Sequence, residues 1–125
     1  MSFSPTLAER FAQTLRTRLA TEALANPATQ AVLLRRLLAV VQALEAFGPQ
    51  AVVPTAAPWP DAAALTARWR DGRALVVATR CPDSAADSRL TLYRHNEITF
   101  SISVGHEQLP AAVARCLSAG GALTH

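Results

Sequence analysis

The histidines and cysteines of this sequence are the side chains best suited to metal binding or nucleophilic catalysis. His106-Glu107 matches the first half of the zinc-peptidase motif H-E-x-x-H, but the second ligand position is occupied by Pro110. Cys81 opens a segment comparable to the C-x5-R phosphate loop, but Asp87 stands at the arginine position and its charge would repel phosphate. The sequence therefore predicts no catalytic residue, no metal site and no cofactor.

The remaining titratable groups are too scattered to form a reaction centre by spacing alone. His95 and His106 are expected at opposite ends of one strand, about 30 Å apart at about 3.3 Å per residue, so they cannot share a metal within one subunit. Cys81 and Cys116 have no second cysteine at metal-ligand spacing and are expected to be free thiols. An enzyme or small-ligand protein that uses His95, His106 or a cysteine is the third of three functional hypotheses.

A polar sheet face is the stronger candidate for a binding surface. In E-I-T-F-S-I-S-V, residues 97–104, apolar and polar side chains alternate strictly, which predicts a strand with one buried and one solvated face. The preceding strand, 89–94, alternates in the same way. The polar side chains of both strands are expected to form a docking surface for a protein partner: Arg89, Thr91, Tyr93, Thr99, Ser101 and Ser103.

The basic residues offer a second functional hypothesis. All 12 are arginines, the net charge is +3 and the isoelectric point is about 9.7. Guanidinium groups bind phosphate in a bidentate manner, so nucleic acid (RNA) could bind the arginine-bearing sheet face. A GC-rich, bacterial-type composition also produces many Arg and Ala codons, and no run of like charges indicates a nucleic-acid tail. The candidate phosphate contacts are Arg80, Arg89 and Arg94.

Two amphipathic helices must precede this sheet. Thr6 and Glu9 have the spacing of a capping box, and apolar residues at intervals of four predict a helix that ends near Ala25. A second helix over about 28–47 has an apolar arc wider than one neighbouring helix can cover. Either the sheet or a second subunit must cover the rest, and Leu34, Leu38 and Val41 are the candidate self-association residues.

Four prolines between 49 and 60 predict a linker or strap with neither helix nor ladder pairing. A third, shorter helix is expected from Pro60 to about Asp71, then strands over 74–81, 89–94 and 97–104, and a last helix that ends before Gly120. Alternation on the last two strands favours a three-residue hairpin loop over 94–96, which sets Leu92 opposite Ile98 and Leu90 opposite Phe100.

The order helix, three antiparallel strands, helix over residues 60–119 resembles the topology of double-stranded RNA-binding domains. Those domains contact phosphates with basic residues at the start of the last helix. Here that position offers His106, Glu107 and Gln108, and Arg115 is the only arginine of the helix. The departure argues against RNA binding by this route.

The predicted fold class is α+β, with one size-limited core rich in alanine. The expected organisation is a helical hairpin (1–48), a Pro-rich strap (49–60), a helix, three-stranded sheet, helix unit (61–121) packed with the hairpin as one domain, and a tail (122–125). No secretory signal or membrane-spanning run is evident, which favours the cytoplasm. The leading hypothesis is a small non-enzymatic protein-binding or regulatory module, such as an adaptor, that acts as a homodimer.

Overall fold

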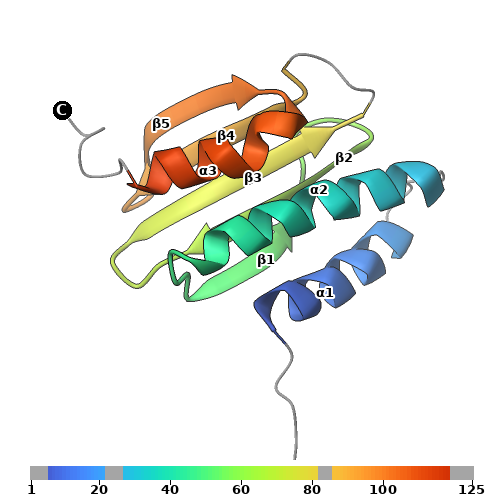
Figure 1. Ribbon diagram of the computed structural model, residues 1–125, viewed down its shortest axis with the longest axis horizontal. Coiled ribbons are helices and arrows are strands. Elements are labelled where there is room, and N and C mark those ends of the chain that lie inside the picture. The colour runs from blue at the N-terminus through green and yellow to red at the C-terminus, as the bar shows by residue number, and fades with distance from the viewer. Residues whose placement is uncertain (1–5, 22–26, 82–85, 119–125) are drawn as a thin grey trace, which may run out of the picture.

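A computed structural model describes residues 6–21, 27–81 and 86–118 of the chain. Helices α1 (Leu7–Thr21) and α2 (Pro27–Glu45) precede five strands, and a 3₁₀ turn η1 (His106–Gln108) leads into α3 (Leu109–Ser118). The strands are β1 (Ala51–Thr55), β2 (Ala62–Arg68), β3 (Arg73–Arg80), β4 (Ser88–Arg94) and β5 (Glu97–Val104). They form one antiparallel sheet in the order β1-β2-β3-β4-β5, and the three helices lie on one face of it (Figure 1).

The prediction of a three-stranded sheet is wrong, because two further strands lie between α2 and β3. The segment Ala62–Arg68, predicted as part of a helix, is β2, which pairs with β1 on one side and β3 on the other. Six of its seven residues are buried. Tertiary pairing on both edges outweighs the helix propensity of its alanines. The likeness to double-stranded RNA-binding domains ends here, since the helix that opens that topology does not exist.

The Pro-rich segment also contains a strand, β1, although four prolines there predict no ladder pairing. Pro54 is compatible with β1 because an edge strand needs only half of its N–H groups for pairing. The carbonyl oxygen of Pro54 accepts a hydrogen bond of 3.1 Å from Nη1 of Arg18 in α1. Proline thus marks an edge strand here rather than excluding a strand.

The helices α1, α2 and α3 lie in three of the four segments predicted to be helical. The predicted end of the first helix near Ala25, the predicted stop at Gly120 and the tail over 122–125 lie outside the described residues. Thr6 Oγ1 accepts the backbone N–H of Glu9 at 3.1 Å, as the capping box requires. The sheet covers the wide apolar arc of α2, whose buried residues join one core with residues from α1, α3 and the inner face of the sheet. Leu109, Val113 and Leu117, the predicted stripe of the last helix, are all buried in that core.

The β4–β5 hairpin differs from the predicted three-residue loop. The loop is a two-residue turn at His95 and Asn96, whose φ angles of 51° and 69° suit a primed hairpin turn. A register shift between Leu92 and Tyr93 then restores the alternation, so Leu92 lies opposite Phe100 and Leu90 opposite Ile102. A β-bulge, rather than a loop with an odd number of residues, therefore brings the apolar side chains of β4 and β5 onto the same face of the sheet.

The β2–β3 hairpin turns at Gly72, whose φ of +93° suits glycine and strains other residues. The backbone N–H of Arg73 donates to Oδ1 of Asp71 at 3.0 Å, and this bond lowers the pKa of the Asp71 carboxyl. A Cβ on Gly72 would lie 2.5 Å from the ring of His95 in the β4–β5 turn. The two turns therefore touch at the same end of the sheet.

Gly72→Ala is expected to lower the free energy of unfolding by about 1 to 3 kcal/mol, since alanine must adopt a positive φ and displace the His95 ring. Urea unfolding followed by circular dichroism measures the loss. Gly48→Ala is the matched control, because Gly48 also has a positive φ (61°) but nothing lies within 4 Å of its added Cβ. A Gly72→Ala variant as stable as the wild type would refute the account of this turn.

Candidate functional site: the open face of the sheet

The face of the sheet opposite the helices is free of helices in the part of the chain that the structure describes (Figure 1). We call it the open face, and the strand register assigns its side chains. Its floor is made of short side chains, such as Ala64 and Ala78, which are only 1% and 3% exposed. The open face consists of Ala51, Val53, Thr55, Ala62, Ala64, Thr66, Arg68, Ala74, Val76, Ala78, Arg80, Arg89, Thr91, Tyr93, Ile98, Ser101 and Ser103.

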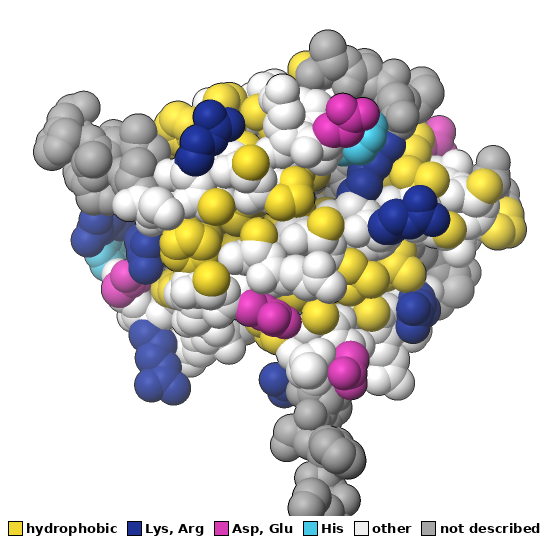
Figure 2. Space-filling model, in the orientation of Figure 1, with side chains coloured by type: hydrophobic (Ala, Val, Ile, Leu, Met, Phe, Trp, Pro, Cys, Tyr) yellow, Lys and Arg dark blue, Asp and Glu magenta, His cyan; other side chains and the backbone are white. Residues whose placement is uncertain are grey.

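The charge on the open face has a single sign. Three of its positions are arginines and none is an aspartate or glutamate. Arg80 and Arg89 lie at one end of the face, and Arg68 lies at the other end of β2. The opposite, helix-bearing side is mixed instead, with basic and acidic side chains around a broken band of hydrophobic ones (Figure 2). Positive charge without a carboxylate partner on the same face favours an anionic ligand.

Arg80 and Arg89 converge on one aromatic ring. The β1–β2 connection places the indole of Trp59 against both guanidinium groups, with Cζ of Arg80 4.8 Å and Cζ of Arg89 5.0 Å from the ring centroid. Cation–π attraction holds both side chains beside the ring and offsets part of their mutual repulsion. We call these three residues the Trp59 cluster. Neither guanidinium forms an ion pair among the described residues.

The structure places most of the predicted docking surface on this open face. Arg89 lies opposite Ser103, and Thr91 lies opposite Ser101, with their hydroxyl oxygens 3.3 Å apart. Tyr93 also belongs to the face. Thr99 differs, since it is the extra residue at the bulge and its hydroxyl donates to the carbonyl oxygen of Leu92 at 3.2 Å.

The three predicted phosphate contacts do not form one group. Arg80 and Arg89 share the Trp59 cluster, whereas Arg94 lies at the far end of β4, opposite Arg73 and Glu97. Arg94 lies five positions after Arg89 along β4, a distance of about 17 Å.

The proposed self-association residues of α2 divide as well. Val41 is fully buried in the core of its own chain, whereas Leu34 and Leu38 are partly buried and pack against that core. Only the last two thus keep surface on the helix side.

A buried carboxylate forms a second polar cluster, which the sequence does not reveal. Asp87 is 0% exposed, and its Oδ1 accepts the backbone N–H of His106 at 2.7 Å and the hydroxyl of Ser88 at 3.0 Å. Its Oδ2 lies 2.7 Å from Nδ1 of His106 and 3.7 Å from Nη1 of Arg36. Arg36 also donates to the carbonyl oxygen of Arg80 at 3.0 Å. Asp87 therefore links α2, the start of β4 and η1.

The Asp87 cluster lacks the geometry of a nucleophilic triad. The Ser88 hydroxyl bonds to Asp87 and, at 3.0 Å, to Thr79 Oγ1, rather than to the imidazole of His106. His95 lies in the turn at the other end of β5. No group of three His, Cys, Asp or Glu side chains that could hold a metal ion occurs within residues 6–21, 27–81 and 86–118.

Neither Cys81 nor Cys116 forms a disulfide. Cys116 is buried on α3, and its burial raises the pKa of its thiol. A higher thiol pKa lowers the thiolate fraction at neutral pH, so Cys116 is a poor nucleophile. Cys81 is half-buried at the end of β3, where its backbone N–H donates to the carbonyl oxygen of Asp61.

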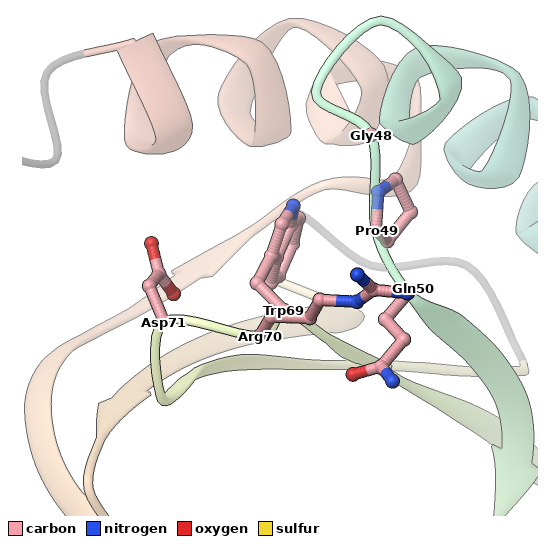
Figure 3. Close-up of a pocket in the computed structure, with 6 residues that line it drawn as sticks. All are labelled: Gly48, Pro49, Gln50, Trp69, Arg70 and Asp71. Carbon is pink, nitrogen blue, oxygen red and sulfur yellow. The ribbon is translucent and has the colours of Figure 1, made fainter.

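A shallow pocket of about 490 Å³ lies at the end of the sheet where the α2–β1 connection meets the β2–β3 turn. Its lining residues come from 48–50 and 69–71. In the close-up the Arg70 guanidinium lies beside Gln50, whereas the Asp71 carboxyl points away from it (Figure 3). The Trp69 indole N–H donates to the carbonyl oxygen of Phe47 at 2.8 Å. The pocket contains no histidine or cysteine, and its position separates it from the Trp59 cluster.

Comparison of the chain with protein-family models, with curated proteins and with solved structures finds no match. No helix among the described residues is both long enough and apolar enough to span a membrane.

Proposed function

We propose that the protein is a small cytoplasmic, non-enzymatic protein-binding module that acts as a homodimer and docks an acidic segment of another protein on its open face. The observation that carries this proposal is the charge of that face, which has three arginines and no carboxylate position. A guanidinium group binds a carboxylate through two parallel hydrogen bonds, which gives direction as well as affinity. Acidic side chains in the partner would form ion pairs with Arg80 and Arg89, which form none with the described residues of their own chain.

The Trp59 cluster has the composition of a binding hot spot. Tryptophan, tyrosine and arginine contribute most to protein interfaces, and the cluster joins one tryptophan to two arginines. Ala64 and Ala78 beside it are buried under their neighbours, so the longer side chains around them, Arg80 and Arg89 among them, form the accessible surface at this end of the face.

The arrangement of the other polar groups supports a binding role rather than catalysis. The buried Asp87 accepts hydrogen bonds on both oxygens from its own chain, and these contacts join three elements of the fold. Its chemistry is therefore that of a structural tie.

Nucleic acid is the competing ligand for the same arginines. Single-stranded nucleic acid binds along a continuous cationic track with aromatic rings free to stack on the bases. Here Arg94 is separated from Arg80 and Arg89, and the ring of Trp59 already contacts two guanidinium groups. These features favour a protein partner.

The proposal is tested by affinity capture from nuclease-treated extract of the native host. The wild-type chain is expected to retain at least one protein at physiological salt, and Arg80→Glu/Arg89→Glu is expected to lose it. The matched control, Arg35→Glu/Arg115→Glu, makes the same change in net charge at exposed sites on α2 and α3. The control is expected to capture the protein as well as the wild type does.

Equal capture by both double variants would show that the open face is not the docking surface. Material that nuclease removes, together with an elevated 260/280 nm absorbance ratio, would instead identify nucleic acid as the ligand.

A further inference from the structure

The two edges of the sheet differ in how well they are protected from pairing with another strand. The β1 edge carries Pro54, and Arg18 of α1 already bonds to its carbonyl oxygen. The β5 edge has eight residues with no proline and no arginine. Long edge strands without proline or cationic side chains readily pair with a further strand.

The apolar side chains of β5 are incompletely covered by their own chain. Ile102 lies on the helix side of the sheet yet is 39% exposed, and Ile98, beyond the bulge, is 62% exposed. Phe100 beside them is half-buried. Of the three large hydrophobic side chains that are exposed in the described chain, two therefore belong to this one edge.

We infer that β5 pairs in antiparallel fashion with β5 of a second copy, about a two-fold axis that passes through Ser101 perpendicular to the sheet. The inference rests on the proposed homodimer and specifies how it forms. A perpendicular axis keeps the helices of both copies on one side of the joined sheet. It also places each residue opposite one whose side chain lies on the same face. With the axis at Ser101, Phe100 lies opposite the partner's Ile102, so exposed apolar surface meets apolar surface.

Burial favours this register over its nearest competitor within residues 100–104, between the bulge at Thr99 and the end of β5. With the axis at Ile102 instead, Phe100 would lie opposite the partner's Val104, which is only 7% exposed and already covered by its own chain. The Ser101 register pairs Phe100 with the partner's Ile102, which is 39% exposed, and therefore covers more apolar surface.

The same pairing leaves the open face accessible. Two open faces join side by side into one ten-stranded surface, and neither Trp59 cluster is covered. Face-to-face association would instead oppose the arginines of the two copies, so their repulsion disfavours it.

The register is tested by disulfide formation in a Cys81→Ser background. Residues directly opposite in an antiparallel pair have Cα atoms about 4.5 to 5.5 Å apart, within the disulfide limit of about 7 Å. Ser101→Cys is therefore expected to form a covalent dimer on mild oxidation. Ser103→Cys is the matched control, because its two copies would lie about 13 Å apart along the strand and cannot join.

Light scattering on the unmodified chain provides the second measurement. It is expected to give a dimer that Ile102→Lys dissociates, with at least about a tenfold rise in dissociation constant from burying two ammonium groups. Val53→Lys, on the β1 edge, is expected to remain dimeric.

A dimer in which Ser103→Cys links and Ser101→Cys does not would overturn the Ser101 register. A dimer that neither cysteine links and that Ile102→Lys leaves intact would overturn β5 pairing but not the homodimer. A monomer at every concentration would overturn both, while leaving capture by the open face as a separate question.

Discussion

Asp87→Ala is expected to lower the free energy of unfolding by about 3 to 5 kcal/mol, because it removes the buried carboxylate whose Oδ2 lies 3.7 Å from Nη1 of Arg36. The side chain of Arg36 is only 8% exposed, so water cannot replace the lost carboxylate. The backbone N–H of His106 and the hydroxyl of Ser88 lose acceptors at the same time. Equilibrium urea unfolding measures the change.

A double-mutant cycle with Arg36→Ala separates the charge pair from the other contacts of Asp87. The double variant is expected to lose less than the sum of the two single losses, since each single substitution already removes the contact between Arg36 and Asp87. Glu107→Gln, an exposed neighbour of His106, is expected to match the wild type. Strict additivity, or a stable Asp87→Ala variant, would show that Asp87 is not a structural tie.

Trp69→Ala is expected to destabilise the fold by about 3 to 5 kcal/mol, as truncation of a buried large aromatic side chain does. Trp69 is 8% exposed, belongs to the core and bonds to the carbonyl oxygen of Phe47. Its loss would leave a cavity between the end of α2 and the sheet. Thermal unfolding monitored by circular dichroism gives the shift.

Trp59→Ala serves as the comparison, because Trp59 is half-buried, lies outside the core cluster and contacts two arginines on the open face. Its loss is expected to cost about 1 kcal/mol, since exposed cation–π contacts contribute about 0.5 to 1 kcal/mol each. It is nevertheless expected to weaken capture of the acidic partner. Equal destabilisation by the two substitutions would contradict the separation of core and binding tryptophans.

Local periodicity predicts the parts of this fold that one element determines by itself. The alternation of Glu97–Val104 gives β5, and the spacing of Leu109, Val113 and Leu117 gives α3. Segments that depend on their neighbours are missed. The alanines of β2 have no strand pattern of their own, and β1 contains a proline that only an edge position tolerates.

The candidate site divides in the same way. Five of the six predicted docking residues lie on the open face because alternation assigns them there, but Trp59 joins Arg80 and Arg89 through a loop that carries no periodic signal. The predicted and observed registers of β4 against β5 differ by two residues. The predicted pairing of Leu90 with Phe100 would place Asp87 opposite Ser103. The observed register sets Ser88 opposite Val104, and the Asp87 carboxylate then accepts the backbone N–H of His106.

The strand order of the sheet has a consequence for how quickly the chain folds. Each strand pairs with its immediate neighbour in sequence, so every pairing closes a short loop. Sheets built from such local contacts fold faster than sheets of the same size in which strands far apart in the sequence are paired. We expect the five strands to pair one hairpin after another. The contacts among Arg36, Asp87 and His106 are expected to form last, because these residues are far apart in the sequence. In stopped-flow measurements, Arg36→Ala should then accelerate unfolding while leaving the refolding rate nearly unchanged.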